Sequence, residues 1–207
     1  MSPRSVSPVE SAHAAVVPAD AIIVLENVTW ADYQRLLEIR GERAVPRLTY
    51  VKGVLELMTP SRPHESIKSM IGRLVEAWCF EHDVAISPYG SWTHESKDAE
   101  RGIEPDECYV LGDVDDPDRC DLAIEVVWST GGVSKLDAYR PLGVQEVWFW
   151  RNGRIEVYGL RDTGYVQLPG SDVLPGIDLD QLVRFIDIKP MTRAVREYRA
   201  MLRASRA

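Results

Sequence analysis

The sequence predicts an α/β fold with a mixed central β-sheet flanked by helices, preceded by an N-terminal helix and a β-hairpin. Two observations predict it. Short apolar runs of strand length alternate with segments of helical periodicity, in the order helix, hairpin, helix, strands, helix, strand. The chain has 207 residues, which is long enough for one domain of this kind with a sizeable core, and it contains no internal repeat.

The N-terminal segment, residues 1–21, is rich in proline, serine and alanine and predicts a flexible tail. It carries one arginine and no continuous apolar core, so it does not resemble a signal peptide. Order is expected from residue 22, and residues 22–189 are expected to form the main domain. In "VTWADYQRLLEIR", Thr29 is a candidate N-cap for a helix whose residues, from Tyr33 onward, follow helical spacing.

The next segment, "RLTYVKGVLELM", alternates in polarity, and Lys52-Gly53 at its middle fits a two-residue turn. It therefore predicts a β-hairpin. "SRPHESIKSMIGRLVEAWCFEHD" places Ile67, Met70, Ile71, Leu74, Val75 and Trp78 on one face, which predicts a long amphipathic helix.

The second half of the chain predicts strands at 85–89, 106–111 and 122–128, and a helix over 135–142 capped by Ser134. Further strands are expected at "VQEVWFW", "RIEVYGL" and "GYVQLP". Residues 190–207 predict an Arg-rich helix with an apolar stripe of Met191, Val195, Tyr198 and Leu202. This helix is expected to dock on the domain with a solvated basic face; contact with nucleic acid or another anionic partner is the alternative.

The composition excludes several classes of protein. A net charge of -8 argues against a protein that coats nucleic acid non-specifically, although it permits a local acidic metal site. No apolar run approaches the length of about 18 residues that a membrane span needs. The three cysteines are odd in number and lack CxxC spacing, so a disulfide framework or zinc knuckle is not expected. A reducing cytoplasm fits this pattern best. The cysteines are expected to be small buried residues.

One residue contradicts its surroundings. Glu125 lies at the centre of "DLAIEVVWS", the most apolar run, where an ionised carboxylate costs several kcal/mol unless it is compensated. Asp106 follows a proline in "GIEPDECYV", at the start of another strand-like run. Two acids on adjacent strands can share a divalent cation, and Mg²⁺ favours such oxygen ligands. Cation binding would remove the cost of burying Glu125.

Four segments, "RLTYVKGVLELMTPSRPHE", "GIEPDECYV", "DLAIEVVWS" and "KLDAYRPLGVQEVWFW", together resemble the Uma-type restriction-endonuclease family of bacteria, within the PD-(D/E)xK nuclease superfamily. They occur in the family's order, from about Thr29 to Leu182. The resemblance does not include the N-terminal tail or the Arg-rich helix. It implies a restriction-endonuclease-like fold.

The resemblance also implies roles for individual residues. Asp106 would be the first metal-binding carboxylate and Glu125 the second. The superfamily usually has a lysine two residues after the second acid, but here that position is Val127; the lysine would instead be Lys135, near the start of the next helix. Glu65 would be a further metal-site acid and His64 would orient a phosphate or water. Glu56 and Glu104 are additional candidates.

Structural explanations compete with each assignment. Asp106 could be a turn residue after proline, and Glu125 could pair with an arginine such as Arg140 or Arg151. Lys135 could be a solvated helix-start residue, and an acid such as Glu65 in a first helical turn favours the helix dipole in any case. Three tryptophans are expected in the core or an interface rather than as base-stacking platforms: Trp128, Trp148 and Trp150.

The implied reaction is Mg²⁺-dependent hydrolysis of a phosphodiester, with Mn²⁺ as a substitute and Lys135 stabilising the transition state. The expected protein is a cytoplasmic homodimer that acts on DNA; RNA or another phosphoester is a weaker possibility. The competing hypothesis is a catalytically inactive, dimeric binding or regulatory module with the same fold. A zinc-protease helix, a P-loop and a GxSxG elbow are absent from the sequence, and the order of acids and lysine does not suit a glycosidase.

Overall fold

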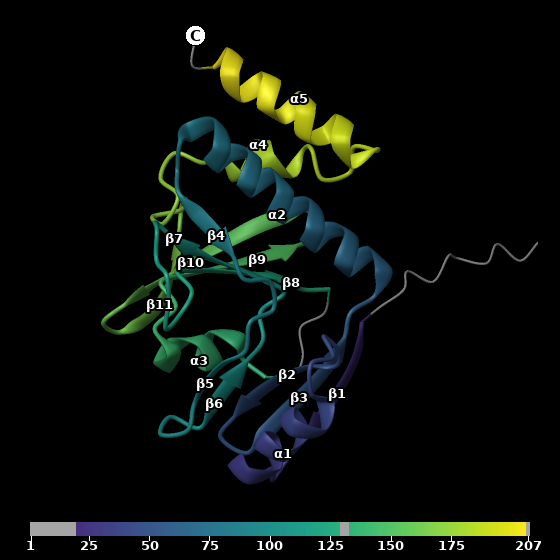
Figure 1. The fold of residues 1–207 in the computed structure, drawn as a ribbon, viewed down its shortest axis with the longest axis vertical. Helices are drawn as coiled ribbons and strands as arrows, with labels where there is room; N and C mark the ends of the chain where they lie inside the picture. The colour runs from purple at the N-terminus through teal and green to yellow at the C-terminus, as the bar shows by residue number, and fades with distance from the viewer. Residues whose placement is uncertain (1–19, 129–132, 206–207) are drawn as a thin grey trace, which may run out of the picture.

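The computed structural model describes residues 20–128 and 133–205. Within these residues the strands form two sheets, which Figure 1 shows one below the other. The first sheet has five antiparallel strands in the order β1-β3-β2-β6-β5. The central sheet has six strands in the order β11-β10-β9-β8-β7-β4, and it is mixed because only β8 and β9 run parallel.

The strands of the first sheet are β1 (Ala21–Leu25), β2 (Arg47–Val51), β3 (Val54–Thr59), β5 (His94–Ser96) and β6 (Arg101–Ile103). Those of the central sheet are β4 (Ile86–Pro88), β7 (Glu107–Leu111), β8 (Leu122–Val126), β9 (Glu146–Arg151), β10 (Arg154–Arg161) and β11 (Gly164–Leu168). The helices are α1 (Trp30–Arg40), α2 (Arg62–His82), α3 (Lys135–Tyr139), η1 (Arg140–Leu142), α4 (Leu179–Val183) and α5 (Met191–Ala204).

The two faces of the central sheet pack against different helices. Alternate residues of β8 point to opposite faces, and Leu122, Ile124 and Val126 belong to the core that contains α2 and α5. Ala123 belongs to a second core with α3 and the first sheet. Glu125 shares the parity of Ala123, so its carboxylate points toward α3 and the junction of the two sheets.

The predicted helices over the first half of the chain are confirmed. Thr29 caps α1 in a capping box with Asp32, in which each residue's side chain bonds the other's backbone N–H. Ser61 caps α2, whose 21 residues bury one face against the central sheet.

Ser134 caps α3 as expected. The segment 135–142 begins as an α-helix but continues as the 3₁₀ turn η1, since Pro141 lacks the N–H that the α-helix would need.

The hairpin is also confirmed, with β2 and β3 joined at Lys52-Gly53. These two strands lie outside the central sheet, in a separate sheet with β1, β5 and β6. Two of these strands, β5 and β6, have three residues each, which is too short for a periodic pattern to identify. Burial of all but the last residue of β2 reflects packing of both faces, against α1 and against the second core.

The C-terminal helix α5 docks on α2, as expected. Tyr198 and Leu202 are buried there, but Met191 is 39% exposed, and Ala194 takes its place in the buried stripe. Arg199 and Arg203 both bond Glu81 of α2, so part of the basic face is used inside the protein.

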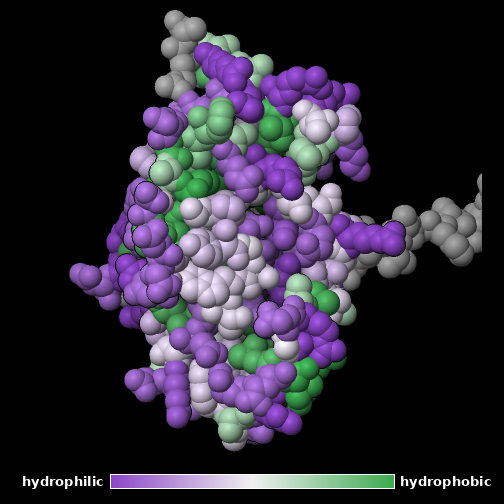
Figure 2. Space-filling view, viewed as in Figure 1, coloured by the Kyte–Doolittle hydropathy of each residue, from purple (hydrophilic) through white to green (hydrophobic). Residues whose placement is uncertain are grey.

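The surface is largely hydrophilic on the face shown in Figure 2. Figure 2 shows hydrophobic side chains in groups toward its upper end and at its lower right. Ile23 of β1 and Ile39 of α1 are more than half exposed. Across residues 20–128 and 133–205, no helix has both the length and the apolar character that crossing a membrane would require.

Candidate active site

Asp106 lies where the chain passes from one sheet to the other. Strand β6 ends at Ile103 in the first sheet, and β7 starts at Glu107 in the central sheet. Because Glu107 pairs with Ile124 of β8, Asp106 is brought beside Glu125. Both acids are fully buried. The two carboxylates that the sequence singled out therefore lie side by side at the sheet junction.

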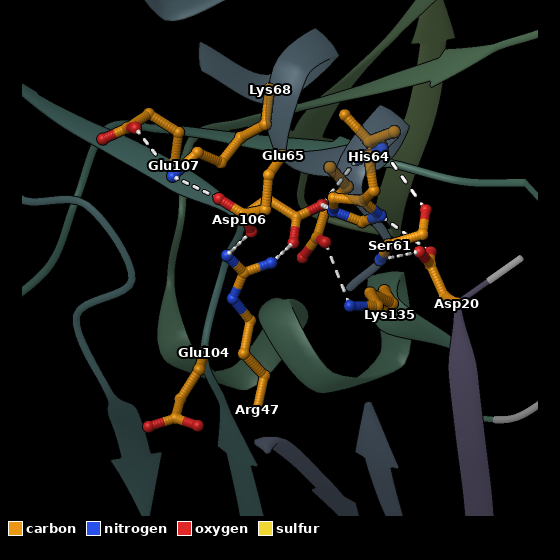
Figure 3. A network of polar contacts seen from close by, with 12 residues as sticks. Asp20, Arg47, Ser61, His64, Glu65, Lys68, Glu104, Asp106, Glu107 and Lys135 are labelled. Carbon is orange, nitrogen blue, oxygen red and sulfur yellow. Dashed lines mark hydrogen bonds and ion pairs between the residues drawn. The ribbon is translucent and has the colours of Figure 1, made fainter. Parts of the chain in front are cut away.

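Asp106 is surrounded by donors (Figure 3). Its Oδ1 accepts a hydrogen bond from Nη1 of Arg47, and its Oδ2 accepts one from the backbone N–H of Val126 at 2.7 Å. Nε2 of His64 lies 2.8 Å from Oδ2. Burial alone would raise the pKa of Asp106, but His64, then Lys135 and Arg47, lower this pKa to about 2. Asp106 is thus held ionised.

Glu125 is held from α3. Its Oε2 lies 3.0 Å from Nζ of Lys135, and its Oε1 accepts a hydrogen bond from the Tyr139 hydroxyl at 2.5 Å. Burial raises the pKa of Glu125, and the negative charge of Asp106 adds to this effect, while Lys135 and Tyr139 oppose it. The alternative of an arginine partner is wrong: Lys135 is the ion-pair partner, and Arg151 bonds Glu156 instead.

Lys135 reaches the acids from its position at the start of α3. Its side chain is only 16% exposed. Burial would lower the pKa of Lys135, but Glu125, Asp106 and Glu56 raise it, so the ammonium group is retained. Val127, two residues after Glu125, lies beyond the end of β8 and packs with the second core. The lysine at the sheet junction therefore comes from the helix.

His64 is buried in the first turn of α2, between two carboxylates. Its Nδ1 lies 2.7 Å from Oδ2 of Asp20, on the side opposite Asp106. Burial would lower the pKa of His64, but Asp106 and Asp20 raise it, which favours the imidazolium. Asp20 also accepts a hydrogen bond from the backbone N–H of Ser61 at 2.7 Å. The sequence suggested that His64 orients a phosphate or water. In the structure its buried ring instead contacts Asp106.

Glu65 binds Arg47 rather than the acid pair. Nη2 of Arg47 donates to Oε1 of Glu65 at 2.7 Å, and Nη1 binds Asp106, so one buried guanidinium joins the two acids (Figure 3). Lys68 lies 3.5 Å from Glu65 and 3.7 Å from Glu107. Among the described residues, no third acid forms with Asp106 and Glu125 a group whose ligand atoms all lie within 4.8 Å of one another. In this structure Glu65 contacts Arg47, and its role as a metal ligand stays a prediction.

Glu56 and Glu104, the two additional candidates, differ in position. Glu56 is buried on β3 and accepts a hydrogen bond from the backbone N–H of Val133 at 3.2 Å. It lines a cavity of about 330 Å³ together with Lys135. Glu104 instead binds Arg40, the backbone N–H of Leu48 and the Thr93 hydroxyl, so its contacts join α1 to the first sheet.

The three tryptophans that the sequence analysis singled out differ in burial. Trp148 and Trp150 are buried in the core, as expected. Trp128 is 36% exposed, packs edge-on against Trp150 at 5.2 Å between ring centroids, and lines the cavity beside Lys135.

The sequence interpretation missed Arg47, Asp20 and Tyr139. Tyr139 could have been found, because it follows Lys135 by four residues and so shares its helix face. Arg47 and Asp20 approach the site from distant parts of the chain, and no local pattern identifies them.

Four cationic side chains lie among the acids of this cluster: Arg47, His64, Lys68 and Lys135.

Fold and site together define a mixed α/β protein with a buried acid pair and a lysine at the junction of two sheets. A family model described as "Uma2: Putative restriction endonuclease" matches residues 30–184. The chain belongs to this family, which confirms the resemblance seen in the sequence.

Among solved structures, the chain is similar to one described as a "putative nuclease belonging to DUF820 from Anabaena variabilis ATCC 29413". The two share 12% sequence identity with a TM-score of 0.45, and the match covers 74% of this chain and 92% of the other. A search of the curated proteins gave no match.

Proposed function

We propose that the protein is a divalent-metal-dependent nuclease that hydrolyses phosphodiester bonds in DNA. The observation that carries the proposal is the convergence of Asp106, Glu125 and Lys135, which come from three separate segments, at one point of the sheet junction. Membership of a restriction-endonuclease family supports the same reaction and the choice of DNA.

The residues fit Mg²⁺. Their donors are carboxylate oxygens. Mg²⁺ is usually held by one or two carboxylates and keeps several waters, so Asp106 and Glu125 suffice without a third protein ligand. Of the two acids, Glu125 is the one whose ion-pair partner, Lys135, lines the cavity. When bound, the cation would polarise a phosphoryl oxygen and acidify a water, with Mn²⁺ as a substitute.

The protein's own side chains have distinct tasks in this proposal. His64 and Arg47 keep Asp106 ionised and fixed, because each places a positive group against one of its oxygens. Tyr139 holds one oxygen of Glu125 in place, and Lys135 binds the other. The ammonium group of Lys135 stabilises the charge that develops on the phosphate oxygens in the transition state.

The test is cleavage of supercoiled plasmid with Mg²⁺ or Mn²⁺, comparing the wild-type protein with Glu125→Gln. We expect a loss of at least about 100-fold in rate, because charge stabilisation of this kind contributes 10²–10³-fold. Glu104→Gln is the matched control: it removes another buried acid, outside the cluster, and should retain cleavage per folded molecule. Equal activity of Glu125→Gln and wild type would refute the proposal, as would cleavage with neither metal.

A second candidate function rests on one observation. Both oxygens of Asp106 are already occupied, by Arg47 on one side and by Val126 and His64 on the other. A site neutralised in this way is what a catalytically inactive binding or regulatory module would retain. A thermal melt separates the two functions: Mg²⁺ or Mn²⁺ should raise the melting temperature of a metal-binding nuclease by mass action and should leave that of the inactive module unchanged.

The homodimer stays a prediction, which the molar mass in solution measures. RNA remains the alternative substrate. Parallel assays on single-stranded RNA and on duplex DNA of the same sequence distinguish the two substrates, since DNA is expected to be cut and RNA spared.

A further inference from the structure

A second group of side chains of the kinds that bind metal ions includes Cys108, two residues after Asp106. His94 of β5, Cys108 of β7 and Cys120, just before β8, come from three segments, and their ligand atoms all lie within 4.8 Å of one another. Nε2 of His94 is 3.9 Å from Sγ of Cys108. His94 is 4% exposed, and both cysteines are fully buried and free.

We propose that His94, Cys108 and Cys120 form a buried zinc site, distinct from the carboxylate site. The donor set selects the metal: thiolate sulfur and imidazole nitrogen are the ligands of Zn²⁺, whereas Mg²⁺ takes oxygen. With Zn–S of about 2.3 Å and Zn–N of about 2.0 Å, tetrahedral coordination places donor atoms roughly 3.5 to 3.8 Å apart. The three side chains therefore need to move together by about 1 Å or less.

Charge also favours Zn²⁺. Two thiolates, a neutral imidazole and a neutral fourth ligand such as water around Zn²⁺ give a neutral complex, which a buried site tolerates far better than a net charge. The same ligands around a monovalent cation would leave one uncompensated negative charge. The carboxylates of Glu107 and Asp121, which interact electrostatically with Cys108 and Cys120, would make that charge more costly.

The position of this cluster gives the ion a structural task. Cys108 follows Asp106 by two residues, and Cys120 lies shortly before the strand that carries Glu125. Zinc would tie β5 of the first sheet to β7 and β8 of the central sheet. It would thereby fix the junction at which the two acids meet.

The test uses the full-length protein, stripped of metal under reducing conditions and titrated with Zn²⁺ or Co²⁺. Cobalt reports its ligands, since thiolate coordination gives a charge-transfer band in the near ultraviolet that carboxylate coordination does not. We expect one equivalent of Co²⁺ to produce this band and Zn²⁺ to displace it. Cys120→Ser should lower the affinity for zinc on the order of 100-fold, because one of its ligands is lost.

Two control variants make the result specific. Cys79→Ser removes a buried cysteine of α2 outside the cluster and should keep the band. Glu125→Gln disables the carboxylate site and should keep it as well, so the outcome does not depend on nuclease activity. Absence of the band in wild-type protein, or a disulfide between Cys108 and Cys120 in protein purified without added oxidant, would overturn the proposal.

Discussion

Removal of the Lys135 ammonium group should destabilise the protein strongly, because it leaves Glu125 buried beside Asp106 without its cation. Breaking a buried ion pair by deleting one partner costs about 3–5 kcal/mol. The Lys135 side chain keeps 16% exposure, so the lower end applies, and Lys135→Met should cost about 3 kcal/mol. For a chain of this length, that corresponds to a fall in melting temperature of about 6–12 °C.

The pH dependence of this loss follows from the pKa of Glu125, which is raised in the folded protein and should rise further without Lys135. Between the unfolded pKa, near the ordinary value of 4.5, and the raised folded pKa, the folded state binds more protons than the unfolded state. The free energy of unfolding of Lys135→Met must therefore fall as pH increases through this window. The defect should be smallest in mild acid.

Urea denaturation of four proteins checks this reasoning: wild type, Lys135→Met, Glu125→Gln and the double variant. The double variant has no uncompensated charge, so it should be more stable than Lys135→Met alone by about 1–2 kcal/mol. Lys68→Met is the matched control, since Lys68 is equally shielded, at 17% exposure, but faces Glu65 and Glu107 at longer range. It should cost less than about 1 kcal/mol. A loss in Lys135→Met no larger than in this control, or no rescue in the double variant, would refute the argument.

Three further predictions concern the same site. Because the pKa of Asp106 is lowered from 3.8 to about 2, its ionised form stabilises the folded protein by about 2 kcal/mol above pH 3.8, and this stabilisation is lost toward pH 2. The difference in unfolding free energy between wild type and Asp106→Asn should therefore shrink as the pH falls over this range. A constant difference would contradict the prediction. Tyr139→Phe removes a donor to ionised Glu125, so the acid limb of the pH–rate profile should move upward by about 1 unit, and an unmoved limb would count against that contact. A base that enters the cavity beside Lys135 would stack on Trp128, so Trp128→Ala should weaken binding of single-stranded DNA by about 1–3 kcal/mol. Fluorescence anisotropy measures this loss. Trp92→Ala is the control, since Trp92 does not line the cavity, and it should leave the binding unchanged.

The sequence predicts the parts of this site that follow from local patterns. Glu125 was detectable because a carboxylate interrupts an apolar run, and Asp106 because it begins the strand-like run before it. Their adjacency follows once these two strands pair antiparallel, as the register of Glu107 with Ile124 shows. The reach of Lys135 depends on α3 packing over the junction, which is a tertiary property.

Other features could not be predicted, for physical reasons. Arg47 begins an ordinary hairpin strand in the sequence, and its partnership with Asp106 exists only because the first sheet meets the central sheet at that point. The grouping of Cys108 and Cys120 has no signature in the sequence, because the two cysteines are twelve residues apart along the chain. Their proximity is produced by the antiparallel pairing of β7 with β8. His94 joins them from a three-residue strand, which is too short for a periodic pattern to identify.

The buried carboxylate of Glu125 constrains how a metal could bind. Its charge is already compensated by Lys135 and Tyr139, so a divalent cation must displace the ammonium group rather than fill an empty position. Lys135, which lines the cavity, would then be free to contact a phosphate bound there. Mg²⁺ should accordingly stabilise Lys135→Met more than wild type, because no cation has to leave; an equal or smaller shift in melting temperature would mean that metal and lysine do not compete for Glu125.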